Sequence, residues 1–387
     1  MKTTLSVLLD IIKSELYGAP LDLHRLEAMT TEEIKALCDL ASSHMILPLV
    51  GDFLGKNKVA MEEGLHGELL QKTMMSVVQT DMLEREIHQV CQLLGERGIP
   101  YIKLKGARIR GLYPEPWMRV SCDMDILVHE EDADRAAELL VTERSYRRES
   151  KGFHDIQMFS PTGIHLELHF TIKENDPVTD PVLDRVWQYS TPAANGSKEY
   201  LQSDAFFVFH IISHMARHFQ GGGCGIRSLV DMQLIREQID YDEAQVQALC
   251  SEAGIEKFYG NIVALTEVWF GDLAHTEATE RMEQFIVTGG VFGCQKNAIA
   301  VSQKKTGGKL GYIWHRLFLP YRQMVVLYPA LEDHRWLMPV CHLRRWANMV
   351  RQGRLKLRAQ ELKRSQQMDD TFSEGVRLML EENGLLK

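Results

Sequence analysis

Two aspartates one residue apart, Asp123 and Asp125, have the type and spacing to bind a cation. They open the run Asp-Met-Asp-Ile-Leu-Val, and alternate residues of a strand point to the same side. Because the run continues as an apolar strand, two like charges beside it need a compensating partner, and a divalent cation is the usual one. The pattern favours a metal site for phosphate chemistry, although such pairs also occur in solvated turns.

A third carboxylate, Glu167, is predicted to join the pair. In the segment Ile164–His169 the apolar residues alternate with His165, Glu167 and His169, so these three share the face opposite the core. The turn residues 160–163, preceded by the run 153–159, predict a hairpin that returns the chain beside the aspartate strand. Three acids then converge on one edge of a sheet.

Cationic residues flank the aspartates. Lys105 and Gly106 close the short apolar strand 101–104, and Arg119 comes shortly before Asp123. Lys105 is either a solvated strand end or a ligand-binding cation. Arg119 is either an ordinary loop charge or a cation that orders the loop or meets phosphate.

A second group of residues lies in the C-terminal half. His210, His214 and His218 recur every four residues, which places three imidazoles along one helical stripe. Three interpretations stay open: zinc ligation by His214 and His218 with an outside acid, the lining of a cleft, and ordinary helix packing. The chain has no His-Glu-x-x-His motif to support the first.

The histidine stripe is followed by the glycine run 221–225 and then by Arg227 and Asp231. The run lacks the Lys-Ser/Thr of a Walker A motif and is interpreted as a turn between helices. Arg227 either meets a bound phosphate or pairs with Asp231 one helical turn further on.

Composition limits the possible functions. The chain has 387 residues, 45% of them hydrophobic, and a formal net charge of −9, which together predict a globular protein of two or three domains and make nucleic acid an unlikely partner. Its seven cysteines form no Cys-x-x-Cys pair, which favours reduced thiols in a cytoplasmic protein. No stretch approaches the ~20 apolar residues of a membrane span. The basic segment 344–364 is either a solvated helix face or a contact for RNA, anionic lipid or an acidic partner.

The periodicity predicts helices up to about residue 95, mixed short strands and helices to about 195, and helices beyond. One helix has a predicted apolar face made of Met74, Val78, Leu83, Ile87, Val90 and Leu94. A second helix is predicted for 130–144, between two strands, and the polar stretch 191–197 is the best boundary. The predicted division is 1–73, 74–195 and 196–387.

These motifs carry a resemblance. Lys-Gly after a strand, a short helix, Arg119, the Asp pair, a helix, a hairpin and then Glu167 resemble the nucleotidyltransferase superfamily related to DNA polymerase beta. More narrowly, the chain resembles the bacterial family called uncharacterised nucleotidyltransferases. That match also takes in the region 214–231 and the late segments 319–321 and 337–340, so it covers most of residues 75 to 350.

The resemblance implies roles for the matched residues. Asp123, Asp125 and Glu167 would hold one or two Mg²⁺ ions, with Mn²⁺ as the alternative, and Glu167 would accept the proton of the acceptor. Lys105 would neutralise charge on the leaving pyrophosphate, and Gly106 would leave space for the phosphates. The nucleotide-binding set implied is Lys105, Gly106, Arg119, His214 and Arg227. Ala107 departs from the Gly-Ser or Gly-Gly of many members, which removes a hydroxyl contact to phosphate.

The expected fold is therefore α+β: a nucleotidyltransferase core with a small mixed sheet, N-terminal helices and a C-terminal helical domain. The expected reaction is magnesium-dependent transfer of a nucleoside monophosphate from a nucleoside triphosphate to a hydroxyl, with pyrophosphate release. The acceptor stays open among a small molecule, a sugar, a peptide and a protein side chain. The alternatives are a catalytically silent nucleotide-binding or regulatory protein on the same fold and a metal-dependent hydrolase that acts through the histidine stripe.

Overall fold

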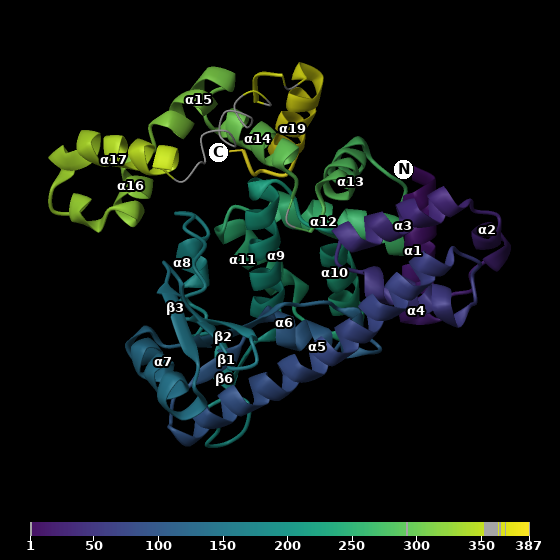
Figure 1. The fold of residues 1–387 in the computed structure, drawn as a ribbon, viewed down its shortest axis with the longest axis horizontal. Coiled ribbons are helices and arrows are strands. Elements are labelled where there is room, and N and C mark those ends of the chain that lie inside the picture. The colour runs from purple at the N-terminus through teal and green to yellow at the C-terminus, as the bar shows by residue number, and fades with distance from the viewer. Residues whose placement is uncertain (1, 292, 352–362, 364, 368, 387) are drawn as a thin grey trace.

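The computed structural model describes residues 2–291, 293–351, 363, 365–367 and 369–386. The N-terminal part is helical, as expected, and ends in a long helix that runs beside the sheet (Figure 1). Its helices are α1 (Lys2–Tyr17), α2 (Leu23–Glu27), α3 (Thr31–Ser43), α4 (Leu47–Lys56) and α5 (Glu63–Glu96).

A five-stranded mixed sheet follows, in the order β1-β2-β5-β4-β3. Its strands are β1 (Tyr101–Lys103), β2 (Asp123–Val128), β3 (Arg147–Lys151), β4 (Asp155–Phe159) and β5 (His165–His169). The predicted hairpin is confirmed as β4 and β5, and β5 pairs with β2 in parallel. Between the strands lie α6 (Lys105–Arg110), the 3₁₀ turn η1 (Pro116–Met118) and α7 (Glu130–Arg144), the last at the predicted bounds. The sheet is followed by α8 (Asp180–Leu183) and the hairpin β6 (Ser190–Pro192) and β7 (Tyr200–Gln202).

The C-terminal part is helical, so the predicted α+β architecture with its small mixed sheet is confirmed. Its first helices are α9 (Asp204–Gly221), α10 (Ile226–Gln238), α11 (Glu243–Glu252), α12 (Glu256–Phe270), α13 (Glu277–Gly289) and α14 (Gln295–Lys305). They are followed by α15 (Lys309–Leu317), α16 (Tyr321–Leu327), η2 (Pro329–Leu331), η3 (Arg335–Leu337), α17 (Met338–Arg351) and α19 (Asp370–Glu382). None of the helices in the described ranges combines the length and apolar character needed to cross a bilayer.

The two faces of the sheet differ in chemistry, and this difference positions the site. On one face Met124, Ile126, Leu166 and Leu168 pack with α5 and α7 in a buried apolar cluster. Because strand residues alternate, Asp123, Asp125 and Glu167 belong to the other face, which looks toward α9 and α10.

Helix α5 corrects one expectation. Leu83, Ile87, Val90 and Leu94 are buried as predicted, but Met74 is 57% exposed and Val78 is 56% exposed. The buried stripe in the first half of the helix instead follows Leu69, Thr73, Ser76 and Thr80, where α5 packs on α4. That stripe continues into Leu83 at three- and four-residue steps, so the small polar residues, and not the methionine and valine, lie on the packed face.

The predicted division into 1–73, 74–195 and 196–387 stays a prediction. Helix α5 is continuous through residues 73 and 74. The stretch 191–197 forms the end of β6 and the turn to β7, and the Tyr101 N–H of β1 donates to the Lys198 carbonyl at 2.8 Å. One apolar cluster contains residues from α1 through α19.

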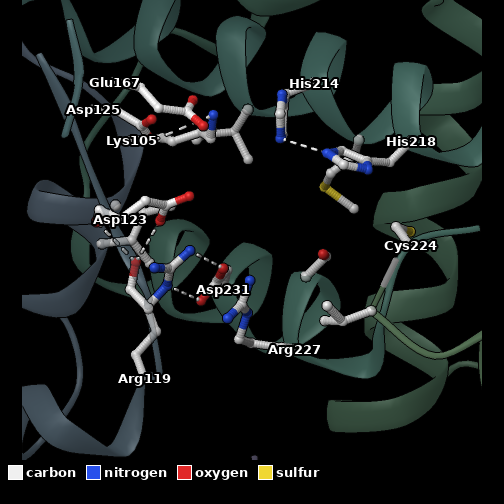
Figure 2. A pocket seen from close by; sticks show the side chains of 17 residues that line it. Lys105, Arg119, Asp123, Asp125, Glu167, His214, His218, Cys224, Arg227 and Asp231 are labelled. Carbon is white, nitrogen blue, oxygen red and sulfur yellow. Dashed lines mark hydrogen bonds and ion pairs between the residues drawn. The ribbon is translucent and has the colours of Figure 1, made fainter. Parts of the chain in front are cut away.

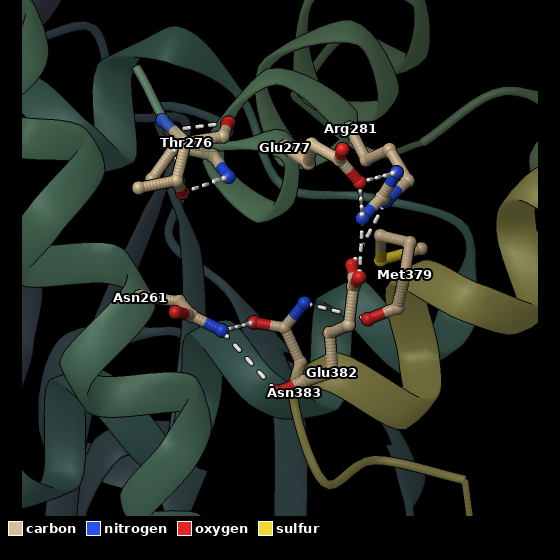
Figure 3. Close-up of polar contacts among 8 residues, drawn as sticks. Asn261, Thr276, Glu277, Arg281, Met379, Glu382 and Asn383 are labelled. Atoms are coloured by element: carbon tan, nitrogen blue, oxygen red, sulfur yellow. Dashed lines mark hydrogen bonds and ion pairs between the residues drawn. The ribbon is translucent and has the colours of Figure 1, made fainter. Parts of the chain in front are cut away.

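The last helix, α19, returns to the helical body (Figure 3). The Arg281 guanidinium of α13 forms an ion pair with Glu382, with Nε 2.9 Å from Oε2. Asn383 is fully buried, accepts a hydrogen bond from Asn261 of α12 at 3.1 Å and donates to the Met379 carbonyl. These contacts fix the end of the chain on α12 and α13.

Candidate active site

The register of β2 and β5 brings the predicted acids together. Asp125 lies opposite Glu167, and Asp123 lies opposite His165. Asp123, Asp125 and Glu167 all line a pocket of about 310 Å³ whose other wall is formed by α9 and α10 (Figure 2). The parallel pairing is what places side chains from residues more than forty positions apart in one row.

The tightest group of potential metal ligands is Asp125, Glu167 and His169, whose ligand atoms lie within 4.8 Å of one another. His169 Nε2 is 3.2 Å from Asp125 Oδ1 and 3.4 Å from Glu167 Oε2. Asp123 is not in this group. Its Oδ1 accepts a hydrogen bond from Ser121 Oγ at 3.1 Å, two residues earlier in the chain and before the start of β2.

Opposite charges stabilise Asp125 in its ionised form. Burial by itself would raise the pKa of Asp125, but the charge of Lys105, whose Nζ lies 3.6 Å from Asp125 Oδ2, and the hydrogen bond from His169 hold that pKa well below its usual range. Burial opposes the charging of His169, yet its hydrogen bonds to Asp125 and Glu167 raise its pKa to about 9. Asp125 and His169 therefore form an ion pair of a carboxylate and an imidazolium, with Lys105 beside it.

The donor set fits a hard divalent cation. Asp125 and Glu167 offer carboxylate oxygens within coordinating reach of a common point, and oxygen is the ligand that Mg²⁺ and Mn²⁺ prefer. Nδ1 of His169 is buried and has no hydrogen-bond partner in the part of the chain that is described. The two carboxylates are held together by cationic side chains, a role that a metal ion also performs.

Gly106 lies at the edge of the pocket, and packing does not require a glycine there. A Cβ at this position would be 3.7 Å from Arg110 Nη1 and 3.8 Å from Ser121 Oγ, which are ordinary contact distances. A side chain at this position would therefore extend the pocket wall toward Arg110 and Ser121. Arg110 is 3% exposed, and its Nε and Nη1 have no partner among the described residues.

Arg119 lines the pocket, but its guanidinium already has a partner. Its Nε and Nη2 donate to the two oxygens of Asp231 at 2.9 and 2.8 Å, and Tyr113 OH donates to the same carboxylate at 2.7 Å. Both members of the ion pair are nearly buried. As it stands, Arg119 joins the loop before β2 to α10.

Of the two predicted alternatives for Arg227, the contact with a bound phosphate stays a prediction and the ion pair is contradicted. Asp231 pairs with Arg119, so the predicted Arg227–Asp231 pair is wrong; the guanidinium of Arg227 instead donates to the Val120 carbonyl. The reason is geometric: Arg119 reaches Asp231 from outside the helix with two parallel hydrogen bonds. Arg227 still lines the pocket, at the start of α10, and its buried Nε has no partner among the described residues.

Two of the three stripe histidines line the pocket (Figure 2). His214 Nδ1 donates to Glu174 Oε1 at 2.9 Å, and its Nε2 is 2.9 Å from His218 Nε2. Burial and the charge of Lys105 lower the pKa of His214, and burial together with His214 lowers that of His218 to about 3. His210 is buried outside the pocket, against Gln202. Two of the three histidines therefore line the cleft, and the third packs inside the protein.

The histidine stripe does not form a three-ligand metal site in the described residues. The glycine run connects α9 to α10, as predicted, with Gly222 and Gly223 at positive φ. A Cβ on Gly222 would lie 3.1 Å from the Ala298 backbone nitrogen, so the turn also needs small residues for packing.

Sequence reasoning missed two residues that contact the site, one in the carboxylate cluster and one beside His214. His169 had a signal, because the strand alternation already placed it on the face of Glu167. Glu174 had none: it follows β5 in an irregular loop, and only the fold brings it to α9.

Comparison with known proteins decides the family. A family model described as "Uncharacterised nucleotidyltransferase" matches residues 30–271, which include every predicted site residue. The chain belongs to this family. No curated protein matches this nucleotidyltransferase. Among solved structures it is similar to the antibiotic-resistance factor ANT(2'')-Ia, determined in solution, at 15% identity and a TM-score of 0.34, over 48% of this chain and 96% of that one.

The predicted resemblance is thus confirmed, and the protein is a nucleotidyltransferase. Helices α13 to α17 and α19 lie outside the matched range, and so do the late segments 319–321 and 337–340 that the predicted resemblance included.

Proposed function

We propose that this nucleotidyltransferase moves a nucleoside monophosphate from a nucleoside triphosphate to a hydroxyl acceptor, with pyrophosphate release and a requirement for Mg²⁺ or Mn²⁺. The observation that carries the proposal is the in-register pair Asp125 and Glu167, charged and open to a pocket, with Lys105 beside them. Buried like charges are costly, and a cation-dependent reaction gives a physical reason to keep them.

Asp125 and Glu167 would hold the metal ion, and Asp123, on the same face of β2, completes the predicted carboxylate set. A bound divalent ion supplies charge neutralisation for the triphosphate and orients it for in-line attack. Lys105 stabilises negative charge on the departing pyrophosphate, and Gly106 leaves the phosphates room. The carboxylate of Glu167 accepts the hydroxyl proton of the acceptor.

The opposite wall is suited to the acceptor. His214 and His218 are kept neutral by burial, and Met215 and Cys224 add apolar surface between them and α10. Both ring nitrogens of His214 are already hydrogen-bonded, so a hydroxyl group at this wall would be bound through Nδ1 of His218, without attracting charge. Glu174 orients His214 through its 2.9 Å hydrogen bond.

The test is metal-dependent release of pyrophosphate from each nucleoside triphosphate, with cell extract as the source of acceptor. Asp125→Asn is expected to lower turnover by on the order of 10²–10³-fold, because it removes a metal-binding charge without changing shape. Asp134→Asn, an exposed aspartate of α7, is the matched control and should leave turnover unchanged.

The outcomes separate the alternatives. Turnover that survives Asp125→Asn would reject nucleotidyl transfer at this site. Nucleotide binding by the unmodified protein without any turnover would support the catalytically silent alternative instead. Release of inorganic phosphate that depends on His214 would support the hydrolase.

A further inference from the structure

The exposed surface of α17 carries a stripe of apolar side chains, which a surface helix usually buries. Trp336, at the turn before the helix, is 74% exposed, and Val340, Leu343 and Val350 are 55%, 62% and 58% exposed. Ala347 is exposed as well. These five residues follow one another at steps of four, three, four and three, so they form a single stripe about 20 Å long. We call them the α17 stripe.

Specific contacts with α15 hold the opposite face of α17, and these contacts turn the stripe outward. Arg345 donates to the carbonyl oxygens of Leu317 and Arg316 at 3.0 and 2.8 Å, and Trp346 Nε1 donates to the Leu317 carbonyl at 3.1 Å. These bonds satisfy the last carbonyls of α15, which have no partners within that helix. The ring of Phe318 packs against Trp346 at 5.3 Å between centroids.

The charge around the stripe is positive. Arg344 and Arg351 are exposed on α17 beside the apolar residues. Residues 334–351 contain four arginines and no aspartate or glutamate, and the exposed acids Glu332 and Asp333 lie just before this segment. A basic surface in an acidic protein selects an anionic partner locally.

A groove lies next to the stripe. It has a volume of about 400 Å³, is lined mainly by apolar side chains that include Leu327, Leu337 and Val340, and has Arg344 in its wall. Arg344 also lies 5.9 Å from the centroid of the Tyr328 ring. The groove thus places an apolar surface next to a cation. A phospholipid has the complementary parts, an acyl chain for the apolar surface and a phosphate group for the arginine.

We propose that α17 binds the surface of an anionic lipid membrane, with its stripe among the headgroups and upper acyl chains and with Arg344 and Arg351 on lipid phosphates. Amphipathic helices with tryptophan and leucine on one side and arginine beside them bind in this way. Figure 1 shows α16 and α17 at one end of the molecule, away from the sheet, where a flat surface can reach them.

The same charges argue against a second copy of this chain. Two α17 helices packed along their stripes would bring Arg344 and Arg351 of one copy near arginines of the other, and the nearest acids, Glu332 and Asp333, lie before the stripe and not along α17. The proposal does not depend on the nucleotidyl transfer chemistry, because the stripe lies outside the pocket and outside the family match.

The test is co-sedimentation of the full chain with phosphatidylcholine vesicles that contain or lack phosphatidylglycerol. The protein is expected to sediment only with the anionic vesicles, with a blue shift of tryptophan fluorescence, and to be released by high salt. Val340→Glu/Leu343→Glu and Arg344→Glu/Arg351→Glu should each weaken binding by on the order of tenfold or more. All four side chains are exposed, so the fold should be unaffected.

Matched controls use exposed residues elsewhere. Met75→Glu on α5, where the side chain is 60% exposed, and Arg147→Glu on β3 should leave vesicle binding unchanged. Failure of the unmodified protein to bind anionic vesicles overturns the proposal, and so does equal binding by Val340→Glu/Leu343→Glu. A concentration-dependent dimer that this double variant converts to a monomer would assign the stripe to a second copy and would equally overturn it.

Discussion

At the scale of single residues, the cluster on β2 and β5 is an arrangement of charges that compensate one another. Lys105 and His169 stabilise the ionised form of Asp125, and His169 also contacts Glu167. Each carboxylate is costly to bury alone, and each becomes tolerable because a cation lies within hydrogen-bond or ion-pair distance. The residues of the cluster are therefore mutually dependent, and their effects on turnover should not be additive.

Gly106→Ala separates a role in ligand binding from a role in folding. The added methyl group meets only ordinary contacts and replaces a glycine in α6, so the free energy of unfolding should stay equal or rise by up to about 1 kcal/mol. Turnover should fall by on the order of tenfold, because the methyl group enters the space proposed for the phosphates. Denaturant unfolding and pyrophosphate release measure the two effects.

Gly95→Ala provides the comparison for that variant. This glycine lies in α5 with no atom near its missing Cβ, so alanine should stabilise the protein and leave turnover unchanged. Full activity in Gly106→Ala would show that the phosphates do not pass this residue.

At the scale of elements, pairing and packing decide which side chains meet. Parallel pairing of β5 with β2 sets Asp125 opposite Glu167, and a slip of one residue would turn Glu167 to the apolar face. At the end of α3, His44 is fully buried: its Nδ1 accepts from the Ile226 N–H of α10 at 3.0 Å, and its Nε2 donates to the Val287 carbonyl of α13 at 3.2 Å. One neutral imidazole thus joins three helices.

His44 predicts an acid-sensitive part of the stability. Burial lowers its pKa from 6.5 to about 4, so below pH 6.5 the unfolded chain binds a proton that the folded chain does not. This contribution is complete above about pH 6.5 and is lost as the pH falls toward 4, by up to about 3 kcal/mol. Denaturant unfolding across this range measures it.

His44→Gln should flatten the pH dependence of the free energy of unfolding, whatever its effect on stability at neutral pH. His66→Gln, at an exposed position of α5, should reproduce the unmodified curve. Parallel curves for His44→Gln and the unmodified protein would contradict the assignment.

At the scale of the whole molecule, buried polar links join the sheet to the C-terminal helices. The Arg119–Asp231 pair and Tyr113 connect the segment before β2 to α10, across more than one hundred residues. Glu382 and Asn383 connect α19 to α13 and α12 (Figure 3). Arg119 and Asp231 of the first link line the pocket, so this ion pair connects the segment before β2 to the α10 side of the pocket.

Asp231→Asn should be strongly destabilising, by about 3–5 kcal/mol, because the charge of Arg119 stays buried without a partner. The paired change Arg119→Met/Asp231→Leu should restore much of that loss, since it removes both charges. Thermal and denaturant unfolding of the single and double variants measure the difference. If Asp231→Asn were as stable as the unmodified protein, Asp231 would not be needed to compensate the buried charge of Arg119.

Local patterns were enough to predict much of the fold and part of the site. The alternation in 164–169, the turn before it and the bounds of α7 are encoded within short windows of sequence, and the structure reproduces them. The apolar face of α5 was only half predicted, because Thr73 and Ser76 are buried by contact with neighbouring elements and not by their own hydrophobicity. Local hydrophobicity cannot anticipate that contact.

The sequence by itself determined which acids share a strand face, because the alternation of side chains along a strand is a property of the backbone alone. Only the tertiary structure decided their partners. That Asp231 pairs with Arg119 and not with Arg227, that Glu174 orients His214, and that His169 joins Asp125 depends on distances between segments far apart in the chain. Long-range pairing follows from how the sheet and the helices pack together, which local periodicity does not specify.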